Sequence, residues 1–162
     1  ESLPNIIQKF SDVNVVLLGD GPEMEKLQNI VKEKHLENNV EFRGWINRND
    51  LPDQISNASI SIGPLKRTTV TENALPIKVL EYMASSLPIL AISGTLPEDV
   101  LVHEKNGYFV KDSKELGKRI CELLDSPKLI KSMGNESLKM VQKFSWEGIV
   151  ADILKSFESV KN

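Results

Sequence analysis

The segment whose residue types most clearly suggest a binding site runs from Pro76 to Ala91. In it, two prolines lie on either side of a short amphipathic stretch, and an apolar run follows. Proline suits the first turn of a helix, because its missing N–H costs no hydrogen bond there. The second proline, Pro88, stands where a helix must already have ended. The pattern therefore predicts a helix that opens at Pro76 and ends near Ala84, followed by a strand over Ile89–Ile92.

The start of this predicted helix offers an anion site. The first backbone N–H groups of a helix have no intrahelical partner, and they lie at the positive end of the helix dipole. We expect the amides of Ile77, Lys78 and Val79 to cradle a phosphate group, with the Lys78 ammonium group within reach of it. Glu81, about one turn further along, could accept hydrogen bonds from two neighbouring hydroxyl groups. An anion beside a diol is the outline of a nucleotide or a sugar phosphate, although the spacing alone also allows Glu81 to be an ordinary exposed glutamate.

Strand-like and helix-like segments alternate along the chain, which is typical of a parallel sheet with helices on both faces. Strands are predicted over residues 13–18, 40–43, 60–62, 89–92 and 108–110. Helices are predicted from Pro22, from Asn49 or Asp50 to Ile55, and from Pro76. Because residues 13–18 are apolar apart from Asn14, we expect this strand to be buried on both faces.

The last third of the chain is predicted to be helical, with helix starts capped by Ser113, Ser126 and Ser145. The last helix carries an apolar stripe made of Trp146, Ile149, Ile153, Leu154 and Phe157. We expect this stripe to pack in the core, with an exposed stripe as the alternative.

The N-terminal residues also have helical spacing, in Leu3, Ile6, Ile7 and Phe10. In an α/β protein such a helix follows a strand, and no strand pattern precedes it. We therefore expect the chain to be a piece of a longer protein.

The overall composition restricts the function further. The 162 residues suffice for one domain, and a net charge of −3 gives no broad electrostatic basis for binding nucleic acid. The single cysteine, Cys121, excludes an internal disulfide and suits a reducing compartment, so we expect a cytoplasmic protein. No apolar run reaches the roughly 18 residues of a membrane span. His35 and His103 are isolated and no Asp-x-Asp pattern occurs, so we expect no metal site.

Several motifs, in order, resemble the donor-binding domain of the retaining glycosyltransferases called group 1 or family 4, which have the GT-B fold. The segments that carry this resemblance are Leu17–Glu23, Val40–Gly44, Ala58–Pro64, Glu81 with Pro88–Ala91, Ser93–Glu98, Asn106–Val110 and Phe144–Trp146. Each motif is weak by itself, but their order and spacing together are a strong indication. The motifs extend over nearly the whole chain.

The resemblance implies a Rossmann-like, doubly wound parallel sheet with additional C-terminal helices, in which residues 1–162 form a nucleotide-sugar-binding domain. It implies retaining transfer from a nucleotide-diphosphate sugar without a metal. The first strand and the N-terminal domain would be absent from the chain, and that domain would hold an acceptor sugar or a lipid-linked acceptor. The full-length protein would then associate peripherally with the inner face of a membrane, and the chain alone would bind nucleotide weakly without catalysis.

The resemblance also implies roles for individual residues. Glu81 matches the second acid of the family motif and would bind the ribose. The first acid would lie eight positions earlier, where this chain has Asn73; a loop bulge of one residue would bring Glu72 there instead, and we favour Asn73. The other candidates are Lys66 and Arg67 for phosphate, Gly94 and Thr95 for the sugar phosphate, and Gly44 and Trp45 for the base.

A dinucleotide-binding dehydrogenase is set aside, whereas an epimerase and a non-catalytic module remain as alternatives. The Gly19-Asp20-Gly21 turn suggests a dinucleotide fingerprint, but its third glycine is replaced by Met24. A sugar-nucleotide epimerase of the same fold class would need acid and base residues that the sequence does not offer. A non-catalytic binding module is compatible with Asn73, which cannot stabilise positive charge as an acid would.

Overall fold

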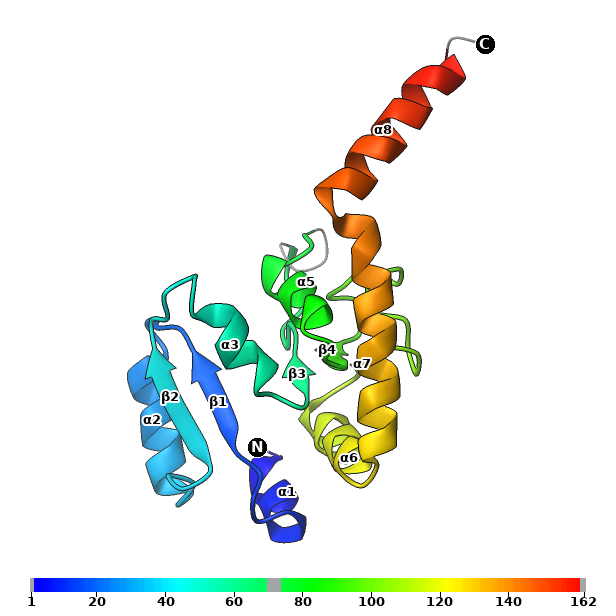
Figure 1. The fold of residues 1–162 in the computed structure, drawn as a ribbon. Helices are drawn as coiled ribbons and strands as arrows, with labels where there is room; N and C mark the ends of the chain where they lie inside the picture. Colours follow the sequence, from blue (N-terminus) through cyan, green and yellow to red (C-terminus); the bar gives the residue numbers. More distant parts are fainter. Residues whose placement is uncertain (1, 70–73, 161–162) are drawn as a thin grey trace.

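The parallel strands form two separate sheets (Figure 1), in a computed structural model that describes residues 2–69 and 74–160. The first sheet pairs β1 (Val15–Leu18) with β2 (Val40–Gly44). The second has the order β3 (Ser61–Ile62), β4 (Ile89–Ile92) and β5 (Gly107–Val110). All these pairings are parallel, as the alternating pattern predicts, so the carboxyl ends of neighbouring strands lie together.

The helices fill the connections between the strands. They are α1 (Leu3–Lys9), α2 (Met24–Glu33), α3 (Leu51–Ser56), α5 (Ile77–Ala84), α6 (Ser113–Leu124), α7 (Pro127–Val141) and α8 (Trp146–Val160), with a 3-10 turn η1 (Gln142–Phe144) before α8. This order of strands and helices confirms the predicted Rossmann-like α/β class with additional C-terminal helices.

Helices cover the three-stranded sheet on both faces, and the core lies there. On one face, Ile89 and Ala91 of β4 pack with residues of α5 and of the segment after β4, namely Val79, Met83, Leu96, Val100 and Leu101. On the other face, Leu90 packs with residues of β5, α6 and α7, namely Tyr108, Val110, Leu116, Leu123 and Met133. The alternation along β4 is the expected consequence of a strand whose successive side chains point to opposite faces.

The expectation that the first strand is buried on both faces is wrong. Val16, Leu17 and Leu18 of β1 expose 39%, 36% and 36% of their surface. Within the described residues β1 pairs only with β2, and the accompanying helix α2 buries none of its residues. One strand pair and one helix cannot cover both faces of β1, so a continuous apolar run does not become a core strand here.

The starts of α6 and α2 differ from the sequence prediction. Asp112 caps α6 in place of Ser113, because its extended backbone lets its carboxylate accept the Glu115 amide hydrogen at 2.8 Å. Pro22 lies before α2, which begins at Met24. The caps at Ser126 and Ser145 are confirmed, since their hydroxyl groups accept hydrogen bonds from the amides of Leu129 and Gly148.

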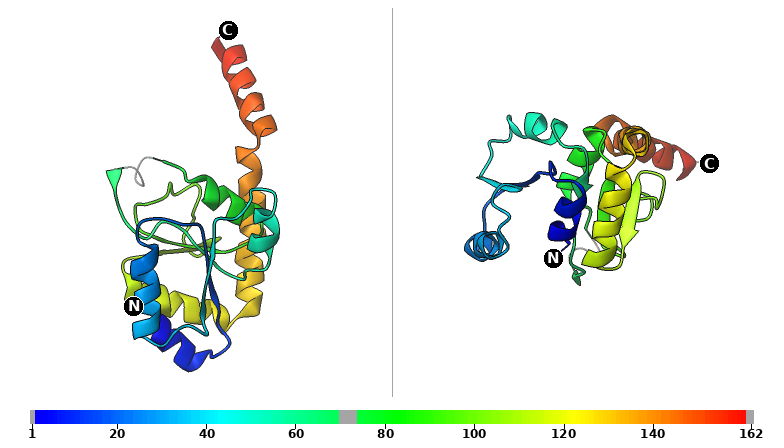
Figure 2. Two further views of the ribbon diagram at one scale, coloured as in Figure 1. Left: turned by 90° about the vertical axis from the view of Figure 1, so that its left-hand side faces the viewer. Right: turned by 90° about the horizontal axis from the view of Figure 1, so that it is seen from below.

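The apolar stripe of α8 is exposed, so the expectation of core packing is wrong. Trp146 exposes 79% of its surface and Phe157 exposes 66%. Figure 1 and the left view of Figure 2 both show α8 extending away from the rest of the described molecule, on the side to which the strands point.

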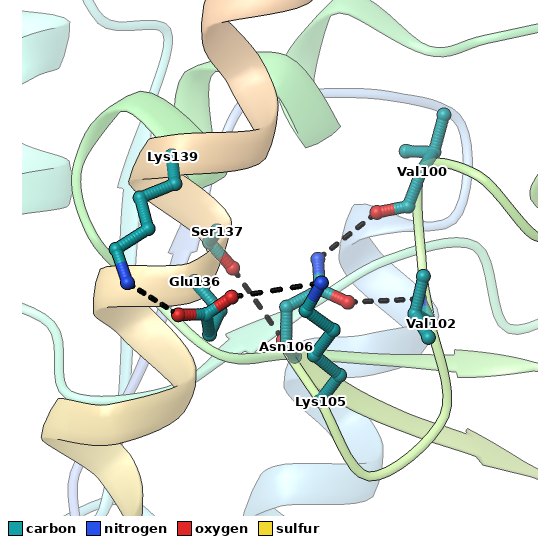
Figure 3. A network of polar contacts seen from close by, with 7 residues as sticks. All are labelled: Val100, Val102, Lys105, Asn106, Glu136, Ser137 and Lys139. Atoms are coloured by element: carbon teal, nitrogen blue, oxygen red, sulfur yellow. Dashed lines mark hydrogen bonds and ion pairs between the residues drawn. The ribbon is translucent and has the colours of Figure 1, made fainter.

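The buried side chain of Asn106 shapes the loop that leads into β5 (Figure 3). Its amide nitrogen donates to the Val100 carbonyl oxygen at 2.9 Å, and its amide oxygen accepts the Val102 amide hydrogen at 2.8 Å. The Ser137 hydroxyl of α7 donates to the Asn106 carbonyl oxygen at 3.4 Å. One side chain thereby satisfies two backbone groups that have no strand or helix partner.

An ion pair cluster fixes the same loop to α7 from the outside. The Glu136 carboxylate lies 2.6 Å from the Lys139 ammonium group and 3.7 Å from that of Lys105 (Figure 3). The hydrogen bond from Lys139 lowers the pKa of Glu136 below its usual value. Both lysine side chains are exposed to solvent, so the contribution of these pairs to stability is small.

Replacing Asn106 by leucine is expected to destabilise the fold by about 2–5 kcal/mol, because the shape is nearly kept while two buried backbone groups lose their partners. Chemical denaturation measures this loss. Ser137→Ala is the matched control: it removes only the longer bond, and the carbonyl of Asn106 retains the amide of Ile89 as a donor. Equal losses in the two variants would contradict the assigned role of the Asn106 side chain.

Candidate functional site

The carboxyl ends of β3 and β4 bring several of the predicted site segments together. A crossover helix between two parallel strands runs antiparallel to them, so α5 begins where β3 ends. The loop after β3, the start of α5 and the turn after β4 therefore gather at one edge of the sheet (Figure 1). In open α/β sheets this edge is where ligands bind.

At the start of α5, Pro76 occupies a different position from the one predicted. Pro76 is the N-cap residue, with extended backbone angles of φ −67° and ψ 128°, and the helix proper begins at Ile77. Its carbonyl oxygen accepts the Val79 amide hydrogen at 2.9 Å. The Val79 amide is therefore already used within the protein, and its predicted part in a phosphate cradle is wrong.

The amides of Ile77 and Lys78 remain as the cradle. No hydrogen bond of either amide is recorded within the described residues, and both residues are exposed. The Ile77 side chain is 67% exposed. Two backbone donors and the Lys78 ammonium group thus face outward at the positive end of α5.

Glu81 lies one turn further along α5 and is half-buried. Its carboxylate makes no hydrogen bond or ion pair with the described residues, so its oxygens can accept bonds from a ligand. Burial, and secondly the negative charge of Glu81, raise the pKa of Tyr82 above its usual value. A half-buried carboxylate next to open helix amides is the arrangement that the sequence predicts.

The loops that carry Arg67 and Gly94 meet at the same edge. Gly94 has a left-handed φ of +78°, and a Cβ atom built there would lie 3.3 Å from the Cζ atom of Arg67. The Arg67 guanidinium group therefore lies against the backbone of Gly94. Lys66, the neighbouring phosphate candidate, is exposed on the same loop. The sequence pattern indicates these two loops as separate candidates, and the structure brings them into contact.

Thr95 is completely buried, whereas Ser93 and Gly94 before it are exposed. Its hydroxyl donates to the Ile92 carbonyl oxygen at 2.7 Å and lies 3.3 Å from the Pro64 carbonyl oxygen. Its amide also donates to Ile92. The side chain is thus directed into the protein, a role that sequence reasoning missed because Pro64 is distant in the chain.

Gly44 and Trp45, the candidates for the base, follow β2 in the other sheet. Gly44 has a left-handed φ of +61°, and its carbonyl oxygen accepts the Gly19 amide hydrogen at 2.7 Å. Trp45 exposes 85% of its surface, so packing does not explain it. Asn73 and Glu72, the two candidates for the first acid, lie outside the described residues.

The most strongly perturbed tyrosine lies elsewhere and is structural. Burial, and then the hydrogen bond to Glu122, raise the pKa of Tyr108 to about 12. The Tyr108 hydroxyl is 3.0 Å from a Glu122 carboxylate oxygen, and the Arg119 guanidinium lies 4.3 Å from the ring centroid. This cluster joins β5 to α6 and does not involve the start of α5.

A cavity between α1 and α6 is also separate from this edge. It has a volume of about 360 Å³, and Asn5, Lys114 and Lys118 provide its main polar groups. None of the predicted site residues lines it. We therefore place the candidate functional site at the carboxyl ends of β3 and β4.

A comparison with known families decides the relationship. Residues 1–140 match the family model described as "Glycosyl transferases group 1". The chain belongs to this family. An uncharacterized glycosyltransferase of Haemophilus influenzae is 31% identical over 151 residues, which are 91% of this chain and 40% of that protein. The chain spans less than half the length of the curated relatives that it matches.

Solved structures of glycosyltransferases share the fold. The pneumococcal O-GlcNAc transferase in complex with UDP and GlcNAc matches 99% of this chain and 32% of its own, with a TM-score of 0.79 at 18% identity. The C-terminal domain of a glycosyl transferase group 1 family protein from Francisella tularensis matches 88% of this chain and 74% of its own, with a TM-score of 0.73 at 22% identity. The chain thus shares the fold of these solved glycosyltransferase structures.

The described residues also bear on a metal site and on a membrane-spanning helix. No group of three or more His, Cys, Asp or Glu residues among them could hold a metal ion. None of the helices formed by residues 2–69 and 74–160 is long and apolar enough to cross a bilayer.

Proposed function

We propose that this chain is the donor-binding domain of a retaining glycosyltransferase, and that the diphosphate of a nucleotide sugar binds at the start of α5. The observation that carries the proposal is the pair of amides at Ile77 and Lys78, with the carboxylate of Glu81 one turn away, none of which has a hydrogen-bond partner among residues 2–69 and 74–160. The membership in group 1 and the solved relative with bound UDP support a nucleotide-sugar donor.

The proposed site has groups that can stabilise the negative charge of the departing diphosphate. Transfer of the sugar leaves negative charge on the departing diphosphate, and donors that are already in place stabilise this charge. The open amides and the ammonium group of Lys78 supply such donors, and the Arg67 guanidinium group lies beside the neighbouring turn at Gly94. These groups carry the proposal that the diphosphate binds without a metal ion.

The remaining groups have proposed roles at the two ends of the donor. Glu81 accepts hydrogen bonds from the ribose hydroxyl groups, and Gly44 with Trp45 borders the base. Asn73, or Glu72 in its place, contacts the sugar near the transfer centre. An acceptor sugar or a lipid-linked acceptor is bound by parts of the polypeptide outside these 162 residues, which also carry any contact with a membrane, so this chain alone binds donor but does not transfer the sugar.

A calorimetric titration with UDP, GDP, ADP and uridine, carried out in EDTA, tests the binding proposal. We expect at least one nucleoside diphosphate to bind more tightly than its nucleoside, because the diphosphate adds charge-assisted hydrogen bonds at α5. The affinity should fall as the salt concentration rises, since exposed charges are screened. Failure of every nucleoside diphosphate to bind would refute the proposed site.

The anomeric outcome separates the enzyme from its alternatives. NMR of the product formed by the intact polypeptide should show the anomeric configuration of the donor, together with release of the nucleoside diphosphate. An epimerised nucleotide sugar without transfer would indicate the epimerase instead. Binding without any turnover by the intact polypeptide would indicate a non-catalytic module.

A further inference from the structure

The buried side chain of Thr95 lies between the turn after β4 and the loop after β3. The Thr95 hydroxyl has one proton, which it donates mainly to the Ile92 carbonyl oxygen at 2.7 Å, with the Pro64 carbonyl oxygen at 3.3 Å as a second acceptor. The Pro64 carbonyl also accepts the Ile92 amide hydrogen at 3.0 Å. Pro64, Ile92 and Thr95 therefore form one connected set of hydrogen bonds between the ends of two neighbouring strands.

This set adjoins the contact between Gly94 and Arg67 along the chain. Gly94 precedes Thr95 in the turn, and its left-handed backbone places it against the Arg67 guanidinium group. Arg67 lies three residues beyond Pro64 on the other loop. A rotation of the Thr95 side chain or a shift of the turn would therefore move Gly94 relative to Arg67.

We propose that Thr95 is a positioning residue, which holds the loops after β3 and β4 in register so that Gly94 and Arg67 together face the diphosphate of the donor. This inference rests on the proposed function. Thr95 does not contact the ligand, since its side chain is completely buried and its amide and hydroxyl donate within the protein. Its effect on binding acts through the two residues that it aligns.

Two substitutions at position 95 test this role. Thr95→Val keeps the branched shape but removes the hydroxyl group, whereas Thr95→Ser keeps the hydroxyl group. We expect Thr95→Val to weaken UDP binding by about tenfold, while the affinity for uridine, which has no phosphate, changes less than about twofold. Thr95→Ser should restore most of the UDP affinity. NMR titrations of UDP and uridine give both constants.

Ser61→Ala provides the matched control. Ser61 is also buried, and its hydroxyl donates to the Pro88 carbonyl oxygen at 2.8 Å, so it joins the same two strands. It does so at their amino ends, away from the candidate site. We expect Ser61→Ala to lower the melting temperature as Thr95→Val does, without changing either affinity.

The outcomes separate this inference from the proposed function. If the unmodified protein binds no nucleoside diphosphate, the proposed function fails and the inference falls with it. If UDP binds to the unmodified protein and equally well to Thr95→Val, the inference alone is wrong. Equal loss of UDP and uridine affinity, or the same loss in Ser61→Ala, would show a general effect of stability and also overturn it. Should Thr95→Val fail to fold, Thr95→Cys, which keeps a weak donor, carries the same comparison.

Discussion

Replacing Gly134 by alanine is expected to prevent the domain from folding stably, although alanine is the better helix former. In an exposed helix this substitution would add about 1 kcal/mol of stability. Gly134 lies in α7, where a Cβ atom would be 1.9 Å from the Ser86 carbonyl oxygen and 2.8 Å from its carbonyl carbon. Both are backbone atoms of the turn between α5 and β4, so no side chain can rotate away. We expect a loss of more than about 3 kcal/mol.

Chemical denaturation followed by circular dichroism measures this effect. Gly21→Ala is the control, because a Cβ atom at Gly21 would meet nothing within 4 Å and its φ is not in the left-handed region. That substitution should change the stability by less than about 1 kcal/mol. A Gly134→Ala protein as stable as the unmodified one would show that α7 and the turn at Ser86 can separate without cost.

Glu81→Gln is expected to weaken the binding of a nucleoside diphosphate by about tenfold to hundredfold. The substitution keeps the size of the side chain but replaces an ionised acceptor by a neutral amide, so charge-assisted hydrogen bonds to the ribose are lost. Glu81 is half-buried without a partner among the described residues, and the fold should therefore tolerate the change. Calorimetric titration with UDP measures the effect.

Comparing UDP with 2′-deoxy-UDP identifies the atoms concerned. If Glu81 binds the ribose hydroxyl groups, the unmodified protein should prefer UDP, and Glu81→Gln should lose most of that preference. The two effects should therefore not add, as expected for groups in direct contact. Glu33→Gln, at the far end of α2, is the control and should leave both affinities unchanged. A preference for UDP that survives in Glu81→Gln would refute the ribose contact.

The segment around α5 could be predicted well because its signals are local. Prolines at positions 76 and 88 fix the limits of the helix and the strand within one or two residues. The open amides and the carboxylate of Glu81 follow from helix geometry alone. The availability of the Val79 amide could not be predicted, since it depends on the extended backbone that Pro76 adopts.

The errors concern tertiary surroundings that a local pattern does not contain. The apolar runs of β1 and α8 predict burial, but burial needs a covering element, and the described residues provide none over much of either surface. Asp112 and Ser113 are both suitable caps, and the backbone conformation decides between them. The role of Thr95 depends on a carbonyl group 31 positions earlier in the chain.

The unequal burial of the two sheets has a consequence for how the molecule responds to a ligand. The segment β1–α2–β2 is held by few buried contacts, so its local opening requires less free energy than that of the core around β4. The residues that would border the base belong to this weaker segment, whereas α5 and β4, next to which the diphosphate would bind, pack in the core. A donor that spans both would stabilise the segment β1–α2–β2 against local opening. Part of the free energy of its contacts would be used to order that segment, so the measured affinity would be lower than the contacts alone would give.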